Sequence, residues 1–261
     1  MYKYPADEVS VASYSFHNLL KEKMIDVYGY LESLVYRYHL HLADIWNGFL
    51  ENMDEDDFKK IRRAMDERGV TLQSLCVDGA HPWDEDREIR EQHHIYAEKM
   101  LRCAEILGAK TMRIDLGVRE DDITEEQFEY TAEKFAAYAK RGAECGFVIG
   151  PENHWGASRR LAVQQRLFRE INSPGYGMLL HLHNWNLAGS ETAQGNDEIA
   201  APMAVHTHVD YECGRQAGEL LPRLRDAGYK GVWSCEHGRG TDEYYGVAAH
   251  VGNILYAVSS K

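Results

Sequence analysis

The sequence lacks any apolar run long enough to cross a bilayer, and its first residues lack the basic start and apolar stretch of a signal peptide. Cysteine is also sparse: the five cysteines form no CxxC pair and are odd in number. This pattern argues against a disulfide framework and suits a reducing compartment. Together, these absences predict a protein of the cytoplasm with no membrane partner.

Basic residues are scarce as well, because 29 Lys and Arg stand against 42 Asp and Glu, giving a net charge of -13. Such a chain repels nucleic-acid phosphates and anionic lipids, so we expect no nucleic acid among its partners. What remains is ordinary for a globular protein, with 44% hydrophobic and 27% charged residues. Disorder is therefore not expected, and the apolar content is enough to fill a large core.

Short apolar or β-branched runs alternate with amphipathic segments along the whole chain, which predicts βα units and a parallel sheet. Several amphipathic segments end in a glycine directly before the next run, as at Gly69 and Gly108, where glycine commonly closes a helix. The predicted strands are 9–15, 41–46, 71–77, 111–116, 147–151, 177–181, 204–209 and 231–236. The predicted helices include 56–68, 88–107, 125–145 and 216–227.

Eight such units in 261 residues predict one α/β domain, 1–261, folded as a (β/α)8 TIM barrel. An open doubly wound sheet would give a similar alternation and stays an alternative at this point. Residues 185–201 are rich in Gly, Ser and Asn, so we expect a loop over the site with a short or absent helix.

Polar side chains gather at the predicted C-terminal strand ends, where barrel enzymes carry their catalytic groups. Glu152, His181, His208 and Glu236 lie about one βα repeat apart, which brings four donors to neighbouring strand tips. Two carboxylates and two imidazoles suit one divalent Mn, Co, Fe or Zn ion better than Mg. Because alternate strand residues face the same way, His154 shares a side with Glu152, and ligand and supporting roles within such pairs stay open.

The segments GPENHWG, LLHLHNW, HTHVDY and WSCEHG resemble the xylose isomerase-like superfamily of sugar isomerases and epimerases, which includes the ketose 3-epimerases. In that family a Glu, an Asp, a His and a Glu after strands five to eight hold one divalent metal. The resemblance implies that Glu152, His181, His208 and Glu236 do so here. His181 departs from the usual Asp, and Asn184 stands where the epimerases often have His. These departures leave the exact reaction open.

The resemblance implies a divalent-metal-dependent isomerase or epimerase that acts on a keto-sugar or cyclic polyol. The metal would stabilise an enediolate, while Glu152 and Glu236 would remove and return the proton. The same enediolate can expel a β-leaving group, so a lyase or hydratase acting on a 3-keto-glycoside or keto-inositol is the alternative. A non-catalytic sugar-binding barrel is the second alternative. A phosphodiester-cleaving repair enzyme of the same superfamily would need more metal ligands and a basic groove, and this acidic chain lacks the positive charge for such a groove.

Further strand-end side chains are candidates for substrate binding. Tryptophans there could pack on the C–H faces of a sugar. Arg113 is either a substrate clamp or a structural partner of Asp115, and Arg215 approximates an arginine that contacts substrate hydroxyls in the epimerases. We expect a small sugar or polyol as the partner, and a homo-oligomer stays open. The substrate-binding candidates are His154, His183, Arg113, Arg215, Trp46, His81 and Trp155.

Overall fold

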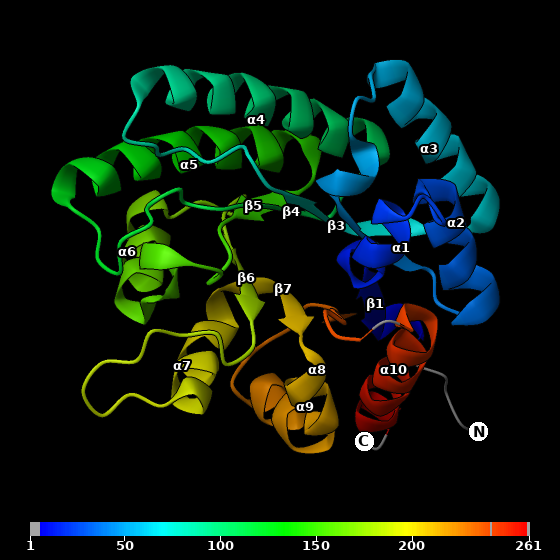
Figure 1. Cartoon of the computed structure of the whole chain (residues 1–261). Coiled ribbons are helices and arrows are strands. Elements are labelled where there is room, and N and C mark those ends of the chain that lie inside the picture. The colour runs from blue at the N-terminus through cyan, green and yellow to red at the C-terminus, as the bar shows by residue number, and fades with distance from the viewer. Residues whose placement is uncertain (1–5, 241, 260–261) are drawn as a thin grey trace.

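The structure is a computed structural model that describes residues 6–240 and 242–259. Eight parallel strands form one sheet with helices around it (Figure 1). Every strand lies within its predicted range, which confirms the TIM-barrel prediction. The strands are β1 (Val9–Ala12), β2 (Leu42–Trp46), β3 (Thr71–Val77), β4 (Thr111–Ile114), β5 (Val148–Gly150), β6 (Met178–His181), β7 (Ala204–Val209) and β8 (Trp233–Cys235).

The strands follow one another around the barrel in the order β5-β4-β3-β2-β1-β8-β7-β6. β1 pairs with both β2 and β8, so the first and last units of the chain are neighbours. Between β5 and β6 the pairing consists of isolated bridges, Ile149 with Tyr176 and Glu152 with Leu179. The barrel is therefore nearly closed, unlike a doubly wound sheet, and its weak seam runs beside one predicted ligand.

The helices match the predicted periodicity closely: α3, α4, α5 and α9 each begin and end within one residue of the predicted ranges. The α-helices are α1 (His17–Lys21), α2 (Val27–Glu32), α3 (Glu55–Arg68), α4 (Arg87–Leu107), α5 (Glu125–Cys145), α6 (Leu161–Ile171), α7 (Ala193–Ala200), α8 (Tyr211–Arg215), α9 (Ala217–Asp226) and α10 (Glu243–Ser259). Short 3-10 turns occupy Ala6–Glu8, Ser13–Phe16, Asn47–Leu50, Gly156–Arg159 and Ala201–Met203, and a π turn occupies Ser33–Arg37.

Local capping explains where these helices begin and end. The Asp54 side chain accepts backbone N–H groups at the start of α3, and the Asp57 carboxylate reaches back to the N–H of Asp54. This reciprocal capping box satisfies donors that the first turn leaves unpaired. At the other end, Gly69 after α3 and Gly108 after α4 adopt φ values of 64° and 70°, the left-handed conformation in which glycine closes a helix.

The segment expected to be mostly loop contains a real but short helix, α7. The Thr192 hydroxyl caps it by accepting the N–H of Gly195. From inside the helix, buried Asp197 accepts the indole N–H of Trp185 at 2.7 Å and the backbone N–H of His183 at 3.1 Å. These tertiary bonds hold a segment whose composition favours a loop, so the helix after β6 is short, not absent.

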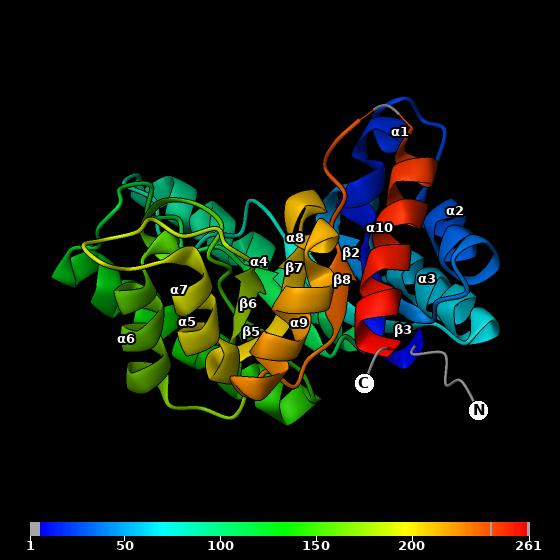
Figure 2. The same cartoon turned by 90° about the horizontal axis from the view of Figure 1, so that it is seen from below.

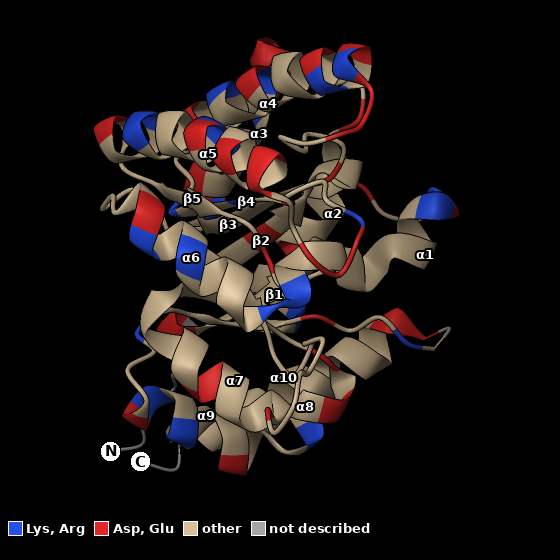
Figure 3. Cartoon of the chain, turned by 90° about the vertical axis from the view of Figure 1, so that its left-hand side faces the viewer, with Lys and Arg blue, Asp and Glu red and all other residues tan. Residues whose placement is uncertain are grey.

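The helical layer is uneven around the barrel. The long helices α4 and α5 cover β3 to β5, while α8, α9 and α10 gather beside β7, β8 and β1 (Figures 1 and 2). Acidic and basic residues are interspersed along the outer faces of α4 and α5 (Figure 3). No helix in the described part of the chain combines the length and apolar character that crossing a bilayer requires.

Candidate metal centre

The four predicted ligands meet at the C-terminal end of the barrel. Glu152 follows β5, His181 ends β6, His208 lies in β7 and Glu236 directly follows β8. The Nδ1 atoms of His181 and His208 each lie 3.0 Å from Oε1 of Glu152. Glu236 faces the same rings, with Oε2 3.5 Å from Nδ1 of His181 and Oε1 3.6 Å from Nδ1 of His208. The spacing argument thus placed these side chains together correctly, while their role as ligands stays a prediction.

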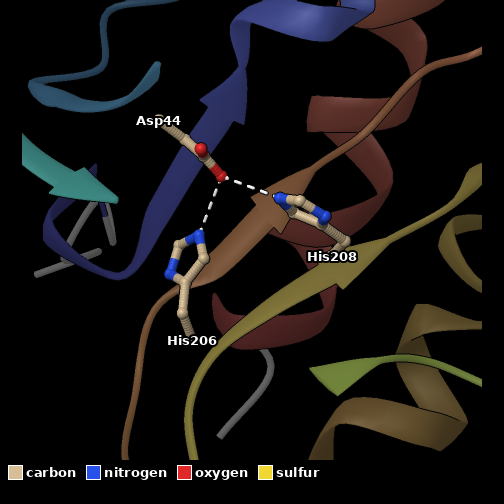
Figure 4. A group of neighbouring side chains, drawn as sticks. All are labelled: Asp44, His206 and His208. Atoms are coloured by element: carbon tan, nitrogen blue, oxygen red, sulfur yellow. Dashed lines mark hydrogen bonds and ion pairs between the residues drawn. The ribbon is translucent and has the colours of Figure 1, made fainter. Parts of the chain in front are cut away.

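A buried carboxylate behind His208 fixes the orientation of that ring. One oxygen of Asp44, in β2, lies 2.8 Å from Nε2 of His206 and 3.1 Å from Nε2 of His208 (Figure 4). The Ser234 hydroxyl donates to the same oxygen at 2.7 Å. Burial raises the pKa of Asp44, but the contacts with His206 and His208 outweigh it and hold that pKa well below its usual range. Ionised Asp44 only accepts, so Nε2 of His208 carries a proton.

This proton placement tests whether a cation fits the cluster. With its proton on Nε2, a neutral His208 turns the lone pair of Nδ1 towards a Glu152 oxygen at 3.0 Å, which is a repulsive contact. A second proton on the ring removes this repulsion. Burial lowers the pKa of His208, but the negative charges of Glu236 and Glu152 together raise that pKa well above its ordinary value. A divalent ion relieves the same repulsion.

The donor atoms also have the spacing and chemistry of a metal site. One atom each from Glu152, His181 and His208 lie within 4.8 Å of one another. Imidazole nitrogen combined with carboxylate oxygen is a common set for first-row divalent metals, which displace the ligand protons on binding. The residues present therefore fit a divalent cation. Two overlapping groups meet the same spacing test, namely Asp44 with His206 and His208, and Asp115 with Glu152 and His154.

Arg113, in β4, offsets much of the negative charge around the cluster. Its Nη1 lies 2.5 Å from Asp78 Oδ1 and 3.2 Å from Asp115 Oδ2, and its Nε lies 3.2 Å from Glu152 Oε2. The guanidinium is buried, with 6% of its side chain exposed. Of the two roles predicted for Arg113, the structure shows the partnership with Asp115 and extends it to Asp78 and Glu152.

A cavity of about 240 Å³ adjoins the cluster. Glu236 reaches its surface, whereas Glu152 is 1% exposed and lies outside the lining. The two glutamates therefore differ in access to a bound molecule, a difference that sequence spacing could not reveal. The charged and aromatic side chains of the lining are Tyr14, Asp44, Trp46, Asp78, Arg113, His154, His181, His208 and Glu236.

Three predicted substrate-binding residues, Trp46, Arg113 and His154, line this cavity. His154 has 40% of its side chain exposed, and its Nδ1 lies 3.0 Å from Asp115 Oδ2. Burial lowers the pKa of His154, but Glu152 and Asp115 reverse that effect and raise it to about 9. A hydrogen bond held at Nδ1 leaves the other ring nitrogen available to a ligand.

Two other predicted substrate residues, His81 and Trp155, lie outside the cavity lining. The Trp155 indole N–H donates to Asp115 Oδ2 at 3.0 Å, so it supports the carboxylate that holds His154. His81 packs edge-on against Trp155 with ring centroids 5.2 Å apart. Their direct contact with substrate stays a prediction that the cavity does not support.

His183 and Arg215 also lie outside that lining. His183 has a left-handed backbone, with φ 64°, and its Nε2 lies 3.5 Å from Asp197. Arg215 is exposed and faces Glu212 at 3.9 Å. Their roles in substrate binding likewise stay predictions without support from the site geometry.

Sequence reasoning assigned no role to three residues that shape the site: Tyr14, Asp44 and Asp78. Asp44 and Asp78 stand at the ends of predicted strands, so their position was the available signal. Tyr14 lies inside the first predicted strand, although the structure ends β1 at Ala12, and nothing in the sequence separated it from the other tyrosines. All three line the cavity beside the predicted ligands.

Comparison with known proteins agrees with this architecture. The family model described as xylose isomerase-like TIM barrel matches residues 40–251. No curated protein matches the sequence significantly.

Several solved structures resemble the chain over nearly its full length. A Mycobacterium smegmatis xylose isomerase-like TIM barrel protein in complex with magnesium has a TM-score of 0.77 at 13% identity, covering 100% of this chain and 99% of that one. D-Psicose 3-epimerase from Clostridium cellulolyticum H10, solved with D-tagatose, has a TM-score of 0.72 at 16% sequence identity, and the match covers 96% of both chains. Escherichia coli 3-keto-D-glucoside 4-epimerase has a TM-score of 0.71 at 14% sequence identity, and the match covers 95% of this chain and 98% of that one.

At such identities the structural likeness shows the fold alone. The family assignment rests instead on the family model, which spans most of the sequence and includes all four candidate ligands. The chain belongs to the xylose isomerase-like TIM barrel family.

Proposed function

We propose that the protein is a divalent-metal-dependent isomerase or epimerase acting on a keto-sugar or cyclic polyol. The observation that carries the proposal is the cluster of Glu152, His181, His208 and Glu236, of which all but Glu152 line a cavity. In TIM-barrel enzymes the active site lies at this end of the strands. The resemblance to sugar epimerases in fold and motif supports the same class of reaction.

These four side chains would hold the ion. When bound, a divalent metal supplies Lewis acidity that makes the C–H next to a carbonyl easier to deprotonate. Behind the ligands, Asp44 keeps the proton of His208 on Nε2, so that Nδ1 faces the centre. Arg113 keeps Glu152 in place through its Nε at 3.2 Å.

Glu236 is the proposed proton carrier, because it reaches the cavity surface with 17% of its side chain exposed. In an isomerisation it would take a proton from the carbon beside the carbonyl and return it to the neighbouring carbon. In an epimerisation it would take the proton on one face, and a second acid would return a proton to the opposite face of the same carbon. Glu152 was predicted as a second acid/base group. Its burial and its contacts with two imidazoles and Arg113 favour a purely ligating role.

Residues at the ends of β1, β2 and β5 would orient the substrate. His154 keeps Nδ1 on Asp115, so its other nitrogen can bind a substrate hydroxyl. Trp46 and Tyr14 present aromatic surface to the cavity, which suits the C–H face of a sugar and excludes water.

Proton exchange tests the proposal. Protein stripped of metal and reloaded with Mn, Co, Fe, Zn or Mg is incubated in deuterated water with a panel of ketoses, keto-inositols and 3-keto-glycosides. NMR should show deuterium entering one C–H position with at least one metal. In Glu236→Gln the exchange rate should fall by about 10²–10⁴-fold, the usual contribution of a general acid–base group. Glu219→Gln, on the exposed face of α9, is the matched control and should behave as wild type.

Other outcomes separate the competing functions. No exchange with any metal and substrate, or full exchange after exhaustive chelation, would contradict the proposal. Release of a leaving group with formation of an unsaturated ketone would instead identify a lyase that uses the same proton removal. Tight sugar binding without exchange or elimination would identify a non-catalytic binding barrel.

A further inference from the structure

A second hollow adjoins the cavity of the candidate metal centre. It measures about 750 Å³, against about 240 Å³ for the inner cavity, and Tyr14, Trp46 and Asp78 line both. Ligand sites in proteins usually measure roughly 300–1,000 Å³, so the inner cavity is small by itself and the two together are ample. The shared wall makes the outer hollow a continuation of the site.

The wall between the two hollows is held by several hydrogen bonds among its own residues. The indole N–H of Trp46 donates to Asp78 Oδ2 at 2.7 Å, and Asp78 is in turn held by Arg113. Asn47 donates to the backbone carbonyl of Asp78 at 3.0 Å and accepts its N–H at 3.0 Å. The six-membered ring of Trp46 also lies over Gly48, where any Cβ atom would overlap the indole. The indole is therefore fixed by a charged partner at one edge and by a glycine at the other.

Tyr14 and His17 extend this aromatic surface outward. The Tyr14 ring meets Trp46 edge-on, with centroids 5.2 Å apart, and stacks on His17 at 4.7 Å with an interplanar angle of 14°. The His17 ring is held by its Nδ1, 2.9 Å from the backbone carbonyl of Tyr14. Tyr14 remains 39% exposed. Two fixed aromatic planes at a right angle thus form a corner that is open to solvent.

Polar side chains surround this corner. The outer hollow is also lined by Lys21 and Glu51, and His17 contributes a polar ring edge. Aromatic planes that pack on C–H groups, bordered by donors and acceptors, match the alternating surface of a pyranose better than that of a purely apolar group.

We propose that the outer hollow is a subsite for a second sugar ring, so that the substrate is a keto-disaccharide whose oxidised ring occupies the inner cavity. This inference rests on the proposed function for the reacting ring. The glycosidic bond would cross the wall at Trp46 and Tyr14. The second ring would stack in the aromatic corner, with its hydroxyls towards Lys21 and Glu51.

The test compares two substrates of the metal-loaded enzyme, 3-ketocellobiose or 3-ketomaltose against methyl 3-keto-glucoside. Proton exchange should show kcat/KM about tenfold higher for at least one keto-disaccharide. Gly48→Ala should lower that ratio to near one, because the new Cβ displaces the Trp46 ring. Gly218→Ala, where a Cβ meets open space, is the matched control and should keep the wild-type ratio. Lys21→Ala, at the exposed rim, gives a second variant should Gly48→Ala fold poorly.

Each alternative outcome is distinguishable. Equal kcat/KM for both substrates in wild type, with proton exchange intact, overturns the subsite and leaves the proposed function standing. A phenyl 3-keto-glucoside as good as the disaccharides overturns the assignment to a sugar. If no substrate exchanges, the proposed function fails, and calorimetry with cellobiose, maltose and methyl glucoside decides the subsite alone. The subsite is supported if a disaccharide binds more tightly than methyl glucoside does and if Gly48→Ala weakens that binding. Any other binding result overturns the subsite.

Discussion

The two halves of the barrel contribute different chemistry to one cavity. Strands β5 to β8 supply the candidate metal ligands, while β1 to β4 supply the residues that hold those ligands and shape the space beside them. Asp44, in β2, reaches across the barrel to His206 and His208 in β7. Arg113, in β4, contacts Glu152 after the adjacent strand β5. The comparison teaches that the ligand half depends on the supporting half for its proton placement and charge balance.

The largest expected effect of breaking this dependence is on stability. In Arg113→Met, the buried carboxylates of Asp115 and Glu152 lose their counter-charge, and the metal-free protein should lose about 3–5 kcal/mol of unfolding free energy. Urea denaturation measures it. Arg102→Met removes a half-exposed arginine that pairs with Glu55 and Glu105, and its loss of unfolding free energy should be clearly smaller. Equal losses in the two variants would show that Arg113 does not balance the cluster.

The next effect concerns the pH dependence of stability. It is expected from His250, a buried histidine in α10 that is not one of the candidate ligands. Burial, with a contribution from His237, lowers the pKa of His250 to about 4. Because the unfolded chain binds this proton near pH 6.5, the folded state loses roughly 3 kcal/mol as pH falls from about 6.5 to 4.

The variant His250→Gln cannot gain that proton, so its unfolding free energy should fall less than that of wild type across this pH window. Thermal or urea unfolding at several pH values measures the difference. Parallel pH profiles for the two proteins would refute the assignment.

A smaller effect sharpens the role of Asp44. Asp44→Asn weakens the acceptor that fixes the His208 proton, and metal affinity should fall about 10–100-fold, as for other carboxylates behind a ligating histidine. Calorimetric titration with Mn or Zn measures it. Ser234→Ala removes one hydrogen bond from Asp44 without touching His208, so its effect should be clearly smaller. Unchanged affinity in Asp44→Asn would mean that the supporting half does not orient the ligand.

The smallest effect lies in the outer layer of the supporting half. Asp54→Ala removes the capping box of α3 and should cost about 1 kcal/mol of unfolding free energy, with metal affinity unchanged. Asp56→Ala, on the exposed first turn, is the control and should cost less. A change in metal affinity in Asp54→Ala would show that the outer layer also controls the site.

The sequence alone was sufficient to predict the strands and long helices, because apolar periodicity and glycine caps are local signals. The helix α7 was harder, since its bonds from Asp197 to Trp185 and His183 are tertiary. The closure of the barrel at β5 and β6 depends on isolated bridges, which leave no pattern in composition or periodicity.

For the site, the repeat spacing was sufficient to bring four ligand candidates together, because successive βα units place strand ends side by side. The spacing could not show how deeply each side chain is buried. Glu152 and Glu236 were therefore predicted to play the same role, although Glu152 is buried away from the cavity and Glu236 lines it. It also could not show pairing across the barrel. The contacts of Asp44 with His206 and His208 join residues more than half the chain apart, and no local pattern encodes them.

Anomalous diffraction from crystals grown with Mn or Zn tests the central claim most directly. The account predicts one peak about 2.0–2.3 Å from Nδ1 of His181, Nδ1 of His208 and one oxygen each of Glu152 and Glu236. A single peak among Asp44, His206 and the Nε2 side of His208, or no peak in metal-saturated crystals, would contradict it.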